Sequence, residues 1–239
     1  MPPEGAVSGA YGEATDPVSL REEAGQVATA RRDLVPLGRL TRPGALLDVG
    51  CWTGSLLIAA RELGWEATGM EPSKWAVGRA RERGLDVIHG ELGSAELDPG
   101  SFRAVTCCDV LEHLADPGVA LDRVHQLLEP GGFLYLTVPD AGSRLARLMG
   151  RHWWSVLPMH LQYFTRGSMV QLLEGHDFES CMVDRHAKVF TVRYYAERMD
   201  AFLPVGGDRL ARTISRTPWA DRLVAPDFGD RMAVLARRV

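Results

Sequence analysis

Short apolar runs alternate with amphipathic stretches along residues 43–139. The apolar runs predict strands at 45–49, 66–70, 85–89, 102–108 and 133–138. Positions with helical spacing lie between them and predict helices at 55–63, 73–83 and 117–129. Because the connections are too long for hairpins, this alternation predicts an α/β fold with a parallel, doubly wound sheet and helices on both faces.

The flanking segments follow a different pattern. Residues 1–15 lack periodicity, and a helical pattern then runs from Asp16, a candidate N-cap, to Leu40. After residue 139 the pattern predicts an irregular aromatic stretch to 165, a helix at 166–174, a strand at 178–184, a helical insertion at 190–222 and a last strand at 231–238. We therefore divide the chain into an N-terminal tail with a lid helix (1–42) and a main domain (43–239).

Composition narrows the class of protein. The 239 residues are 46% hydrophobic and 24% charged, which is enough to bury one sizeable core. The formal net charge is −4, whereas a nucleic-acid-binding protein usually carries a basic excess. The chain also has no apolar run of about 18 residues that would span a membrane. We expect neither a nucleic-acid partner nor a membrane association.

The N-terminus and the cysteines indicate the compartment. No basic start followed by an apolar stretch marks a secretory signal. Cys51, Cys107, Cys108 and Cys181 form no C-x-x-C pair, so free thiols are expected rather than a disulfide framework or a zinc site. Both observations predict a cytoplasmic protein.

The segment LLDVGCWTG (46–54) carries the clearest chemical signal. A strand ends near Asp48, and Gly50 and Gly54 frame a turn into the next helix. Such a turn lets a ligand approach bare backbone at the carboxyl end of the first strand. Glu71 follows at the end of the second strand, where an acid can accept hydrogen bonds from ribose hydroxyls. The pattern predicts a nucleotide-type ligand.

Two such ligands fit this turn. A dinucleotide site of an NAD(P)-dependent oxidoreductase requires G-x-G-x-x-G, but Trp52 and Ser55 stand at the second and third glycine positions. S-Adenosylmethionine has no pyrophosphate and does not need that glycine set. Asp48 can then face the amino group of its methionine moiety. The residues favour S-adenosylmethionine.

Five segments in order extend this signal: LLDVGCWTG, GMEPS, HGEL, CCDVLEHL and LLEPGGFLYLTVP. Together they resemble the motifs of class I S-adenosylmethionine-dependent methyltransferases, and in particular the small-molecule subgroup similar to the ubiquinone-biosynthesis O-methyltransferases. The resemblance covers residues 45–139 and extends weakly through 153–165. It implies a Rossmann-like sheet of about seven strands, with an antiparallel last strand formed by the terminal RMAVLARR.

The resemblance also implies the contacts with S-adenosylmethionine, whose product is S-adenosylhomocysteine. The methionine end would be held by the first loop and by the end of the fourth strand, the ribose by Glu71 and the adenine by the HGEL segment. The implied residues are Asp48, Gly50, Cys51, Trp52, Gly54, Glu71, Glu91, Leu92, Cys108 and Asp109. Trp52 departs from the family, which has glycine there. We expect its indole to pack outward on a neighbour; if it closes the pocket, the chain is a non-catalytic scaffold.

Methyl transfer to oxygen needs a base that removes the proton of the nucleophile, and histidine suits neutral pH. His160 is the first candidate and His113 the second, because the resemblance places both near the acceptor or cofactor. The acceptor pocket is expected to be walled by Trp153, Trp154, Tyr163, Phe164 and Tyr11. Asp109, Glu112 and His113 have spacing that could group metal ligands, but we expect no metal.

These observations predict a methyltransferase that acts on a small molecule, most simply at oxygen. The alternatives are a non-catalytic protein, either S-adenosylmethionine-binding or a scaffold, and, on weaker grounds, an NAD(P)-dependent oxidoreductase. The expected assembly is a monomer or a homodimer.

Overall fold

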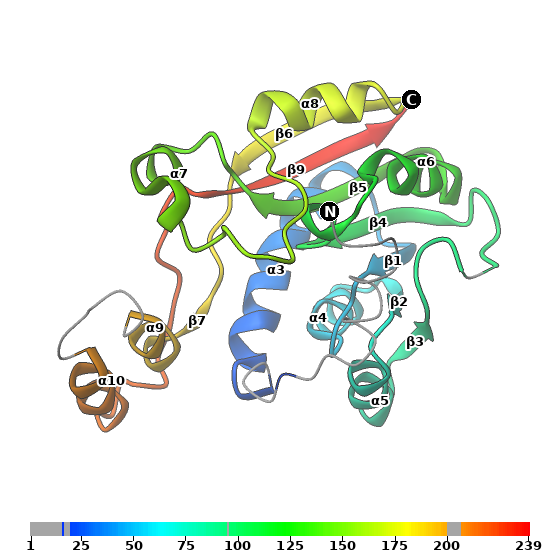
Figure 1. Cartoon of the computed structure of the whole chain (residues 1–239). Helices are drawn as coiled ribbons and strands as arrows, with labels where there is room; N and C mark the ends of the chain where they lie inside the picture. Colours follow the sequence, from blue (N-terminus) through cyan, green and yellow to red (C-terminus); the bar gives the residue numbers. More distant parts are fainter. Residues whose placement is uncertain (1–15, 17–19, 95, 200–206) are drawn as a thin grey trace.

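A seven-stranded sheet runs through the centre of the computed structural model, which describes residues 16, 20–94, 96–199 and 207–239 (Figure 1). Its spatial order is β3-β2-β1-β4-β5-β9-β6. The strands are β1 (Ala45–Val49), β2 (Glu66–Glu71), β3 (Asp86–His89), β4 (Phe102–Cys108), β5 (Leu128–Pro139), β6 (Phe178–Arg185) and β9 (Arg231–Arg238). β9 pairs antiparallel with β5 and β6, whereas the pairs among β1 to β5 are parallel. The predicted fold class is confirmed.

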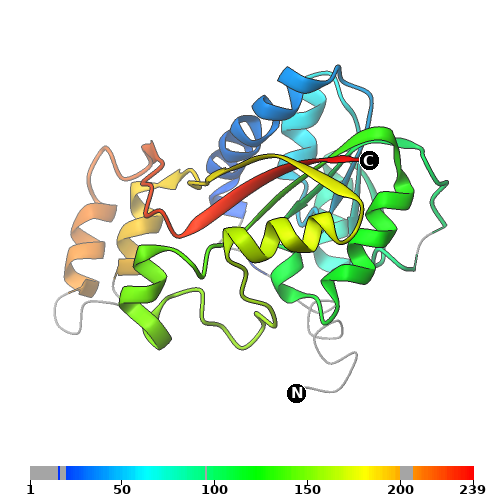
Figure 2. The ribbon, with the colours of Figure 1, turned by 90° about the horizontal axis from the view of Figure 1, so that it is seen from above.

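Helices cover both faces of this sheet (Figure 2). On one face lie α3 (Glu23–Leu40), α4 (Ser55–Glu62) and α5 (Lys74–Glu82), and on the other α6 (Pro117–Leu127) and α8 (Arg166–Glu174). Each layer packs its apolar side chains on the sheet and forms its own buried cluster. The result is the three-layer arrangement expected of right-handed crossovers.

Side-chain caps set several helix starts where the sequence places them. The Asp116 carboxylate accepts from the backbone N–H groups of Gly118 and Val119, with Pro117 in the first turn of α6. Ser73 caps α5 by accepting from Ala76 N. Thr165 and Ser168 form a reciprocal capping box at α8. Each cap satisfies N–H groups that the helix leaves unpaired.

Two helix boundaries differ by more than one residue from the sequence prediction, and the strand expected from 133 begins at Leu128 as β5. The helix expected at 117–129 ends at Leu127, because β5 begins at Leu128 and pairs with Phe102 across an irregularity in the ladder. The helix expected from Asp16 begins at Glu23 as α3, and residues 17–19 lie outside the described part. Leu34 and Leu37 of α3 are buried in the core. One side of α3 thus packs in the core, while Gln26, Thr29 and Asp33 line the cavity. The lid role and the division at residue 42 stay predictions.

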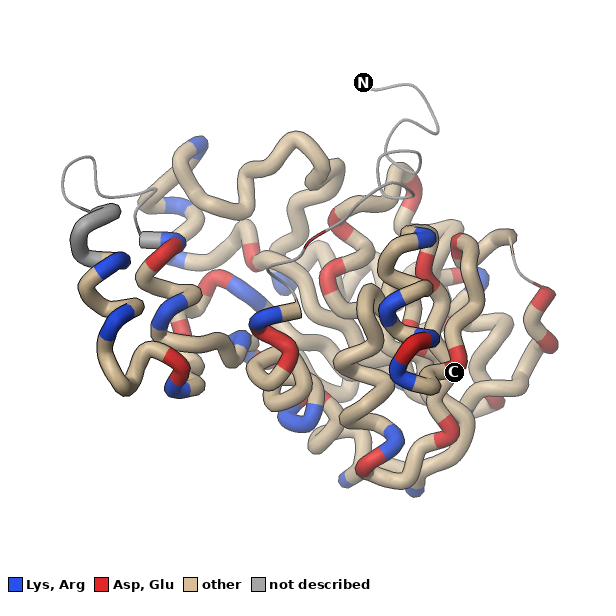
Figure 3. The backbone as a smooth tube through the Cα atoms, turned by 90° about the horizontal axis from the view of Figure 1, so that it is seen from below, with Lys and Arg blue, Asp and Glu red and all other residues tan. Residues whose placement is uncertain are grey.

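The chain after β5 adds further elements besides α8, β6 and β9. It contains α7 (Arg144–Met149), the two-stranded pair β7 (Phe190–Thr191) and β8 (Leu223–Val224), and the helices α9 (Val192–Met199) and α10 (Gly207–Ser215) (Figure 1). α9 and α10 fall within the helical insertion predicted at 190–222. Basic and acidic positions are interspersed over the described chain (Figure 3). Among the described residues, no helix has the length and hydropathy needed to cross a bilayer.

Candidate functional site

A cavity of about 1320 Å³ opens at the carboxyl ends of β1, β2 and β4. The loops that follow these strands line it on one side, and α3 and residues 186–194 line it on another. Parallel α/β sheets bind ligands at this edge, where neighbouring loops diverge. The cavity brings together all ten residues expected to hold S-adenosylmethionine except Gly54.

The loop after β1 adopts the left-handed backbone conformation at three positions. Gly50 has φ 71° and Gly54 φ 88°, and Trp52 between them has φ 48°. A Cβ at Gly50 would lie 2.6 Å from Val110 Cγ2, and one at Gly54 would lie 2.3 Å from Leu85 Cδ1. Both glycines are therefore required by packing as well as by φ.

Trp52 also has a positive φ, although it lacks the conformational freedom of glycine. Non-glycine residues adopt this region at a cost of about 1–2 kcal/mol. The indole packs on Trp75, with ring centroids 5.6 Å apart, and the residue also lines the cavity. The expected packing on a neighbour is present, and the cavity is open beside it.

Asp48 lies buried at the end of β1. The Thr106 hydroxyl donates to its Oδ1 at 2.6 Å. Burial raises the pKa of Asp48 to about 7, against the lowering effect of the Thr106 hydrogen bond. A cation bound in the cavity would favour the ionised form of this buried carboxyl.

Glu71 is held at the end of β2 by two backbone donors. Trp52 N donates to Oε2 at 2.9 Å and Ser73 N donates to Oε1 at 2.8 Å. Burial raises the pKa of Glu71, and these two hydrogen bonds oppose the rise. Each oxygen retains a lone pair that can accept from a ribose hydroxyl. Glu91 and Leu92 line the same cavity beyond it.

Asp109, the residue after β4, lines the cavity and makes contacts that the sequence did not predict. Its φ is 59°, and its two carboxylate oxygens form ion pairs with Lys188 Nζ and with Arg231 Nη2. Both cations come from the chain beyond β5, where motif information ends. Sequence reasoning missed both, and the only available signal was that Lys188 is one of two lysines among 27 basic residues.

His113 and His160 meet in the cavity, although 47 positions separate them in the chain. Their ring centroids are 4.7 Å apart in an edge-to-face arrangement. His113 Nδ1 is 3.0 Å from Met159 O, and His160 Nδ1 is 2.8 Å from Ser155 O. Because carbonyls only accept, both neutral rings carry their proton on Nδ1 and a lone pair on Nε2. Burial lowers the pKa of His113 to about 4 and also lowers the pKa of His160.

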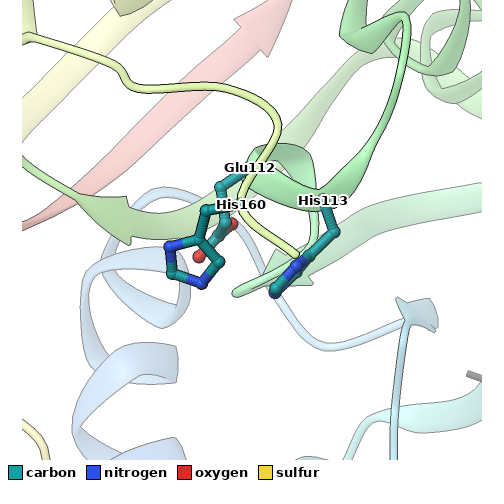
Figure 4. A group of neighbouring side chains, drawn as sticks. All are labelled: Glu112, His113 and His160. Carbon is teal, nitrogen blue, oxygen red and sulfur yellow. The ribbon is translucent and has the colours of Figure 1, made fainter. Parts of the chain in front are cut away.

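Glu112 completes this group (Figure 4). Its side chain is buried, and its Oε2 has no hydrogen-bond partner among the described residues. Burial raises its pKa to about 7. Ligand atoms of Glu112, His113 and His160 lie within 4.8 Å of one another, so a single small cation could contact all three. This set includes His160 where the sequence spacing suggested Asp109.

The aromatic residues expected to wall the acceptor pocket lie elsewhere. Trp153 is buried and donates from Nε1 to Asp230 Oδ2 at 2.9 Å. Phe164 belongs to the core under β5. Trp154 packs edge-to-face on Phe228, and Tyr163 is exposed beside His160. None of the four lines the cavity, whereas His160, Leu161 and Gln162 of the same segment do. Tyr11 lies outside the described residues.

Residues beyond the first loops also line the cavity. Phe190 and Tyr194 stack with ring centroids 4.1 Å apart, and both line the cavity with His160 and Lys188. Asp33 of α3 accepts from Tyr135 Oη and from His186 Nε2, each at 2.9 Å. These residues come from the N-terminal helix and from the chain beyond β5. No motif joins those segments in the sequence, so only the fold brings them together.

Comparisons with known proteins agree with this geometry. A family model described as "Methyltransferase domain" matches residues 21–183. Ubiquinone biosynthesis O-methyltransferases from Pseudomonas paraeruginosa and Xanthomonas campestris are 35% and 37% identical over 99 and 107 residues. These alignments cover 38% and 41% of this chain and 43% and 45% of the relatives, so the chain matches less than half of their length.

Solved structures show the same fold over most of the chain. An S-adenosylmethionine-dependent methyltransferase from Thermotoga maritima aligns with TM-score 0.60 and 19% identity, covering 93% of this chain and 94% of that one. One from Archaeoglobus fulgidus aligns with TM-score 0.61 and 17% identity, covering 93% and 100%. The chain therefore belongs to the methyltransferase domain family and has the fold of its S-adenosylmethionine-dependent members.

Proposed function

We propose that this protein transfers the methyl group of S-adenosylmethionine to an oxygen atom of a small molecule. One observation carries the proposal: a single cavity contains two sets of residues. The first set is the loop after β1 together with Asp48 of β1 and Glu71 of β2, and the second is the pair His113 and His160. The first set suits the cofactor and the second suits proton removal. The named activity of the curated relatives, O-methylation, supports oxygen as the nucleophile.

For methyl transfer to oxygen, the protein must mainly align the reactants and remove a proton. The methyl group on a sulfonium is already activated, so the site must hold a nucleophile in line with it and exclude water. His160 Nε2 removes the hydroxyl proton, and His113 packs against the ring and orients it. The oxygen then forms a bond to the methyl carbon, and the electron pair of the C–S bond returns to sulfur to give S-adenosylhomocysteine.

Both imidazoles are suited to accept a proton. Burial keeps the pKa of each below its ordinary value, so both rings are neutral at physiological pH. The Nδ1–H bonds to backbone carbonyls fix the tautomer in which Nε2 has the lone pair. The proposal assigns no metal. If a divalent cation bound at Glu112, His113 and His160, it would orient the acceptor oxygen and lower its basicity.

Side-by-side calorimetry tests the cofactor. Purified protein is titrated with S-adenosylmethionine, S-adenosylhomocysteine and NAD⁺. Micromolar binding of the two sulfur compounds without binding of NAD⁺ is expected, and it would exclude the oxidoreductase alternative. Absence of binding by all three would instead favour the scaffold alternative.

Labelled methyl transfer tests the acceptor. Phenols, catechols, sugars and amines are screened with labelled S-adenosylmethionine, with and without EDTA. Transfer to hydroxyl compounds that EDTA leaves unchanged is expected. Transfer only to amines would contradict the choice of oxygen. Transfer that EDTA abolishes and Mg²⁺ restores would assign Glu112, His113 and His160 to a metal.

We further propose a small-molecule acceptor, a monomer or homodimer, and a cytoplasmic location.

A further inference from the structure

Residues 186–191 form a segment that lies along α3 on the wall of the cavity. Three buried side chains on the helix side hold it. Asp33 Oδ1 is 2.9 Å from His186 Nε2, Thr29 Oγ1 accepts from Val189 N at 2.7 Å, and the carboxylate of Glu22 accepts from both the N–H and the hydroxyl of Thr191 at 2.9 and 2.8 Å. Spacings of four and seven residues place these side chains on one face of the helix. The segment is therefore fixed at both ends and in its middle.

Lys188 stands in the middle of this segment and lines the cavity. Its backbone carbonyl accepts from Tyr195 Oη at 2.8 Å, and its ammonium pairs with Asp109 at the end of β4. The chain has 27 basic residues but only two lysines, and the other, Lys74, is exposed at the start of α5. A lysine presents a compact charge with three donors, whereas an arginine presents a planar fork.

The ammonium of Lys188 has more hydrogen-bond donors than its contact with Asp109 uses. The partly buried Arg231 takes one carboxylate oxygen of Asp109 and Lys188 takes the other, so two cations share one acid. No other hydrogen bond of Lys188 Nζ is found among the described residues, and an ammonium has two further donors. The remaining donors and the excess positive charge suit an anionic oxygen in the cavity.

The neighbours of Lys188 are the groups that the proposed reaction uses. Burial is the main cause of the lowered pKa of His113 and of His160, and the hydrogen bonds to Met159 and Ser155 oppose it. The charge of Lys188 adds a smaller lowering at both rings. It also opposes the burial effect that raises the pKa of Glu112. Phe190 and Tyr194 supply apolar ring surfaces on the same wall.

We propose that Lys188 is a catalytic residue whose ammonium binds the reacting oxygen of the acceptor as an oxyanion. This inference rests on the proposed function. The hydroxyl proton passes to an imidazole Nε2, the oxyanion stays paired with Lys188 until its lone pair attacks the methyl carbon, and the sulfur takes the electrons of the broken C–S bond. Preorganised charge at a developing oxyanion is a large contribution to many enzymatic rates.

Binding of 4-nitrophenol, followed by the visible absorbance of its phenolate, tests this role without knowledge of the natural acceptor. The proteins are wild type, Lys188→Met, Lys188→Arg and the matched control Lys74→Met, each saturated with S-adenosylhomocysteine. Wild type and Lys74→Met are expected to bind the phenolate at least about tenfold more tightly than Lys188→Met does. Lys188→Arg should fall between them, because it keeps the charge but not the compact geometry.

The outcomes separate the inference from the proposed function. Equal phenolate affinity in wild type and Lys188→Met, or binding of only the neutral phenol or of no phenol to the wild-type complex, overturns the role of Lys188 while leaving the cofactor site intact. Failure of wild type to bind S-adenosylhomocysteine overturns the proposed function and this inference with it. Thermal unfolding of Lys188→Met serves as the folding control, since Asp109 keeps its pairing with Arg231.

Discussion

The backbone N–H of Trp52 donates a 2.9 Å hydrogen bond to the carboxylate of Glu71, which joins the loop after β1 to the end of β2. The acid expected to take the ribose therefore also fixes the loop expected to take the methionine end. Trp52 contributes its backbone to this link and its indole to the contact with Trp75. The residue that departs from the family motif is thus part of the wall of the cavity.

Replacement of Glu71 by glutamine is expected to weaken binding of S-adenosylhomocysteine. A glutamine has a single acceptor oxygen, so it cannot serve Trp52 N, Ser73 N and two ribose hydroxyls together. Loss of hydrogen bonds to a charged group costs about 1.5–3 kcal/mol, or roughly ten- to a hundredfold in affinity. Calorimetry measures the change, with the exposed Glu82→Gln as control. Unchanged affinity would exclude Glu71 from the site.

Replacement of Trp52 by glycine is expected to leave cofactor binding within about threefold of wild type. Glycine removes the cost of a positive φ, about 1–2 kcal/mol, while loss of the Trp75 contact costs about 0.5–1.5 kcal/mol. The two effects oppose each other, and the hydrogen bond from residue 52 N to Glu71 remains. Calorimetry and urea unfolding check both. If binding appeared only in the variant, Trp52 would be the residue that blocks the pocket, as the scaffold alternative requires.

The cofactor side of the site could be predicted from the sequence because it lies within one continuous run of strands and helices. Asp48, Glu71 and Cys108 each lie at or next to the carboxyl end of a strand with a clear apolar pattern, and parallel strands bring these ends to one edge. The caps at Ser73, Asp116 and Thr165 are equally local, so the helix starts at 74, 117 and 166 follow from neighbouring residues alone.

The acceptor side could not be predicted, because its residues meet only through long-range packing. Asp33 contacts His186 across 153 positions, and Lys188 reaches Asp109 across 79. The aromatic stretch at 153–165 has the composition of a pocket wall, but Trp153 and Phe164 pack inward against Asp230 and the core. Composition gives the residue type and does not give the direction of a side chain.

Cofactor affinity is expected to rise with pH through the ionisation of Asp48. Its folded pKa of about 7 lies above the ordinary 3.8. In the free protein the protonated carboxyl therefore predominates below about pH 7. Stability from this group is complete below pH 3.8 and is lost as pH rises through 7. A cationic amino group of the cofactor favours the ionised form instead. Affinity for S-adenosylhomocysteine should therefore be about tenfold greater at pH 8 than at pH 6.

The matched variant for this test is Asp48→Asn. It removes the titration while keeping the size of the side chain, so both the affinity profile and the free energy of unfolding should become flatter between pH 4 and 7. Calorimetry at several pH values gives the first, and urea unfolding gives the second. A wild-type affinity that does not change between pH 6 and 8 would contradict the placement of the amino group at Asp48.

Replacement of His160 by glutamine is expected to lower kcat for an oxygen acceptor by about 10²–10⁴, the usual contribution of a general base. Affinity for S-adenosylhomocysteine should not change, because the imidazole faces the acceptor. In wild type the acidic limb of kcat/KM should lie below pH 6.5, since burial lowers the pKa of His160 and keeps the base neutral. His113→Gln serves as the comparison. If His160→Gln kept full turnover, the general base would be His113, or the reaction would use no histidine base.

Replacement of Asp33 by alanine is expected to destabilise the protein by about 3 kcal/mol, because it leaves two buried donors, Tyr135 Oη and His186 Nε2, without their acceptor. Glu62→Ala, which removes an exposed partner of Arg31, should cost less than about 1 kcal/mol. Urea unfolding measures both. Because Asp33 also holds the segment that carries Lys188, folded Asp33→Ala should lose affinity for 4-nitrophenolate in addition to stability. Equal stability of the two variants would show that the buried contact does not hold this segment in place.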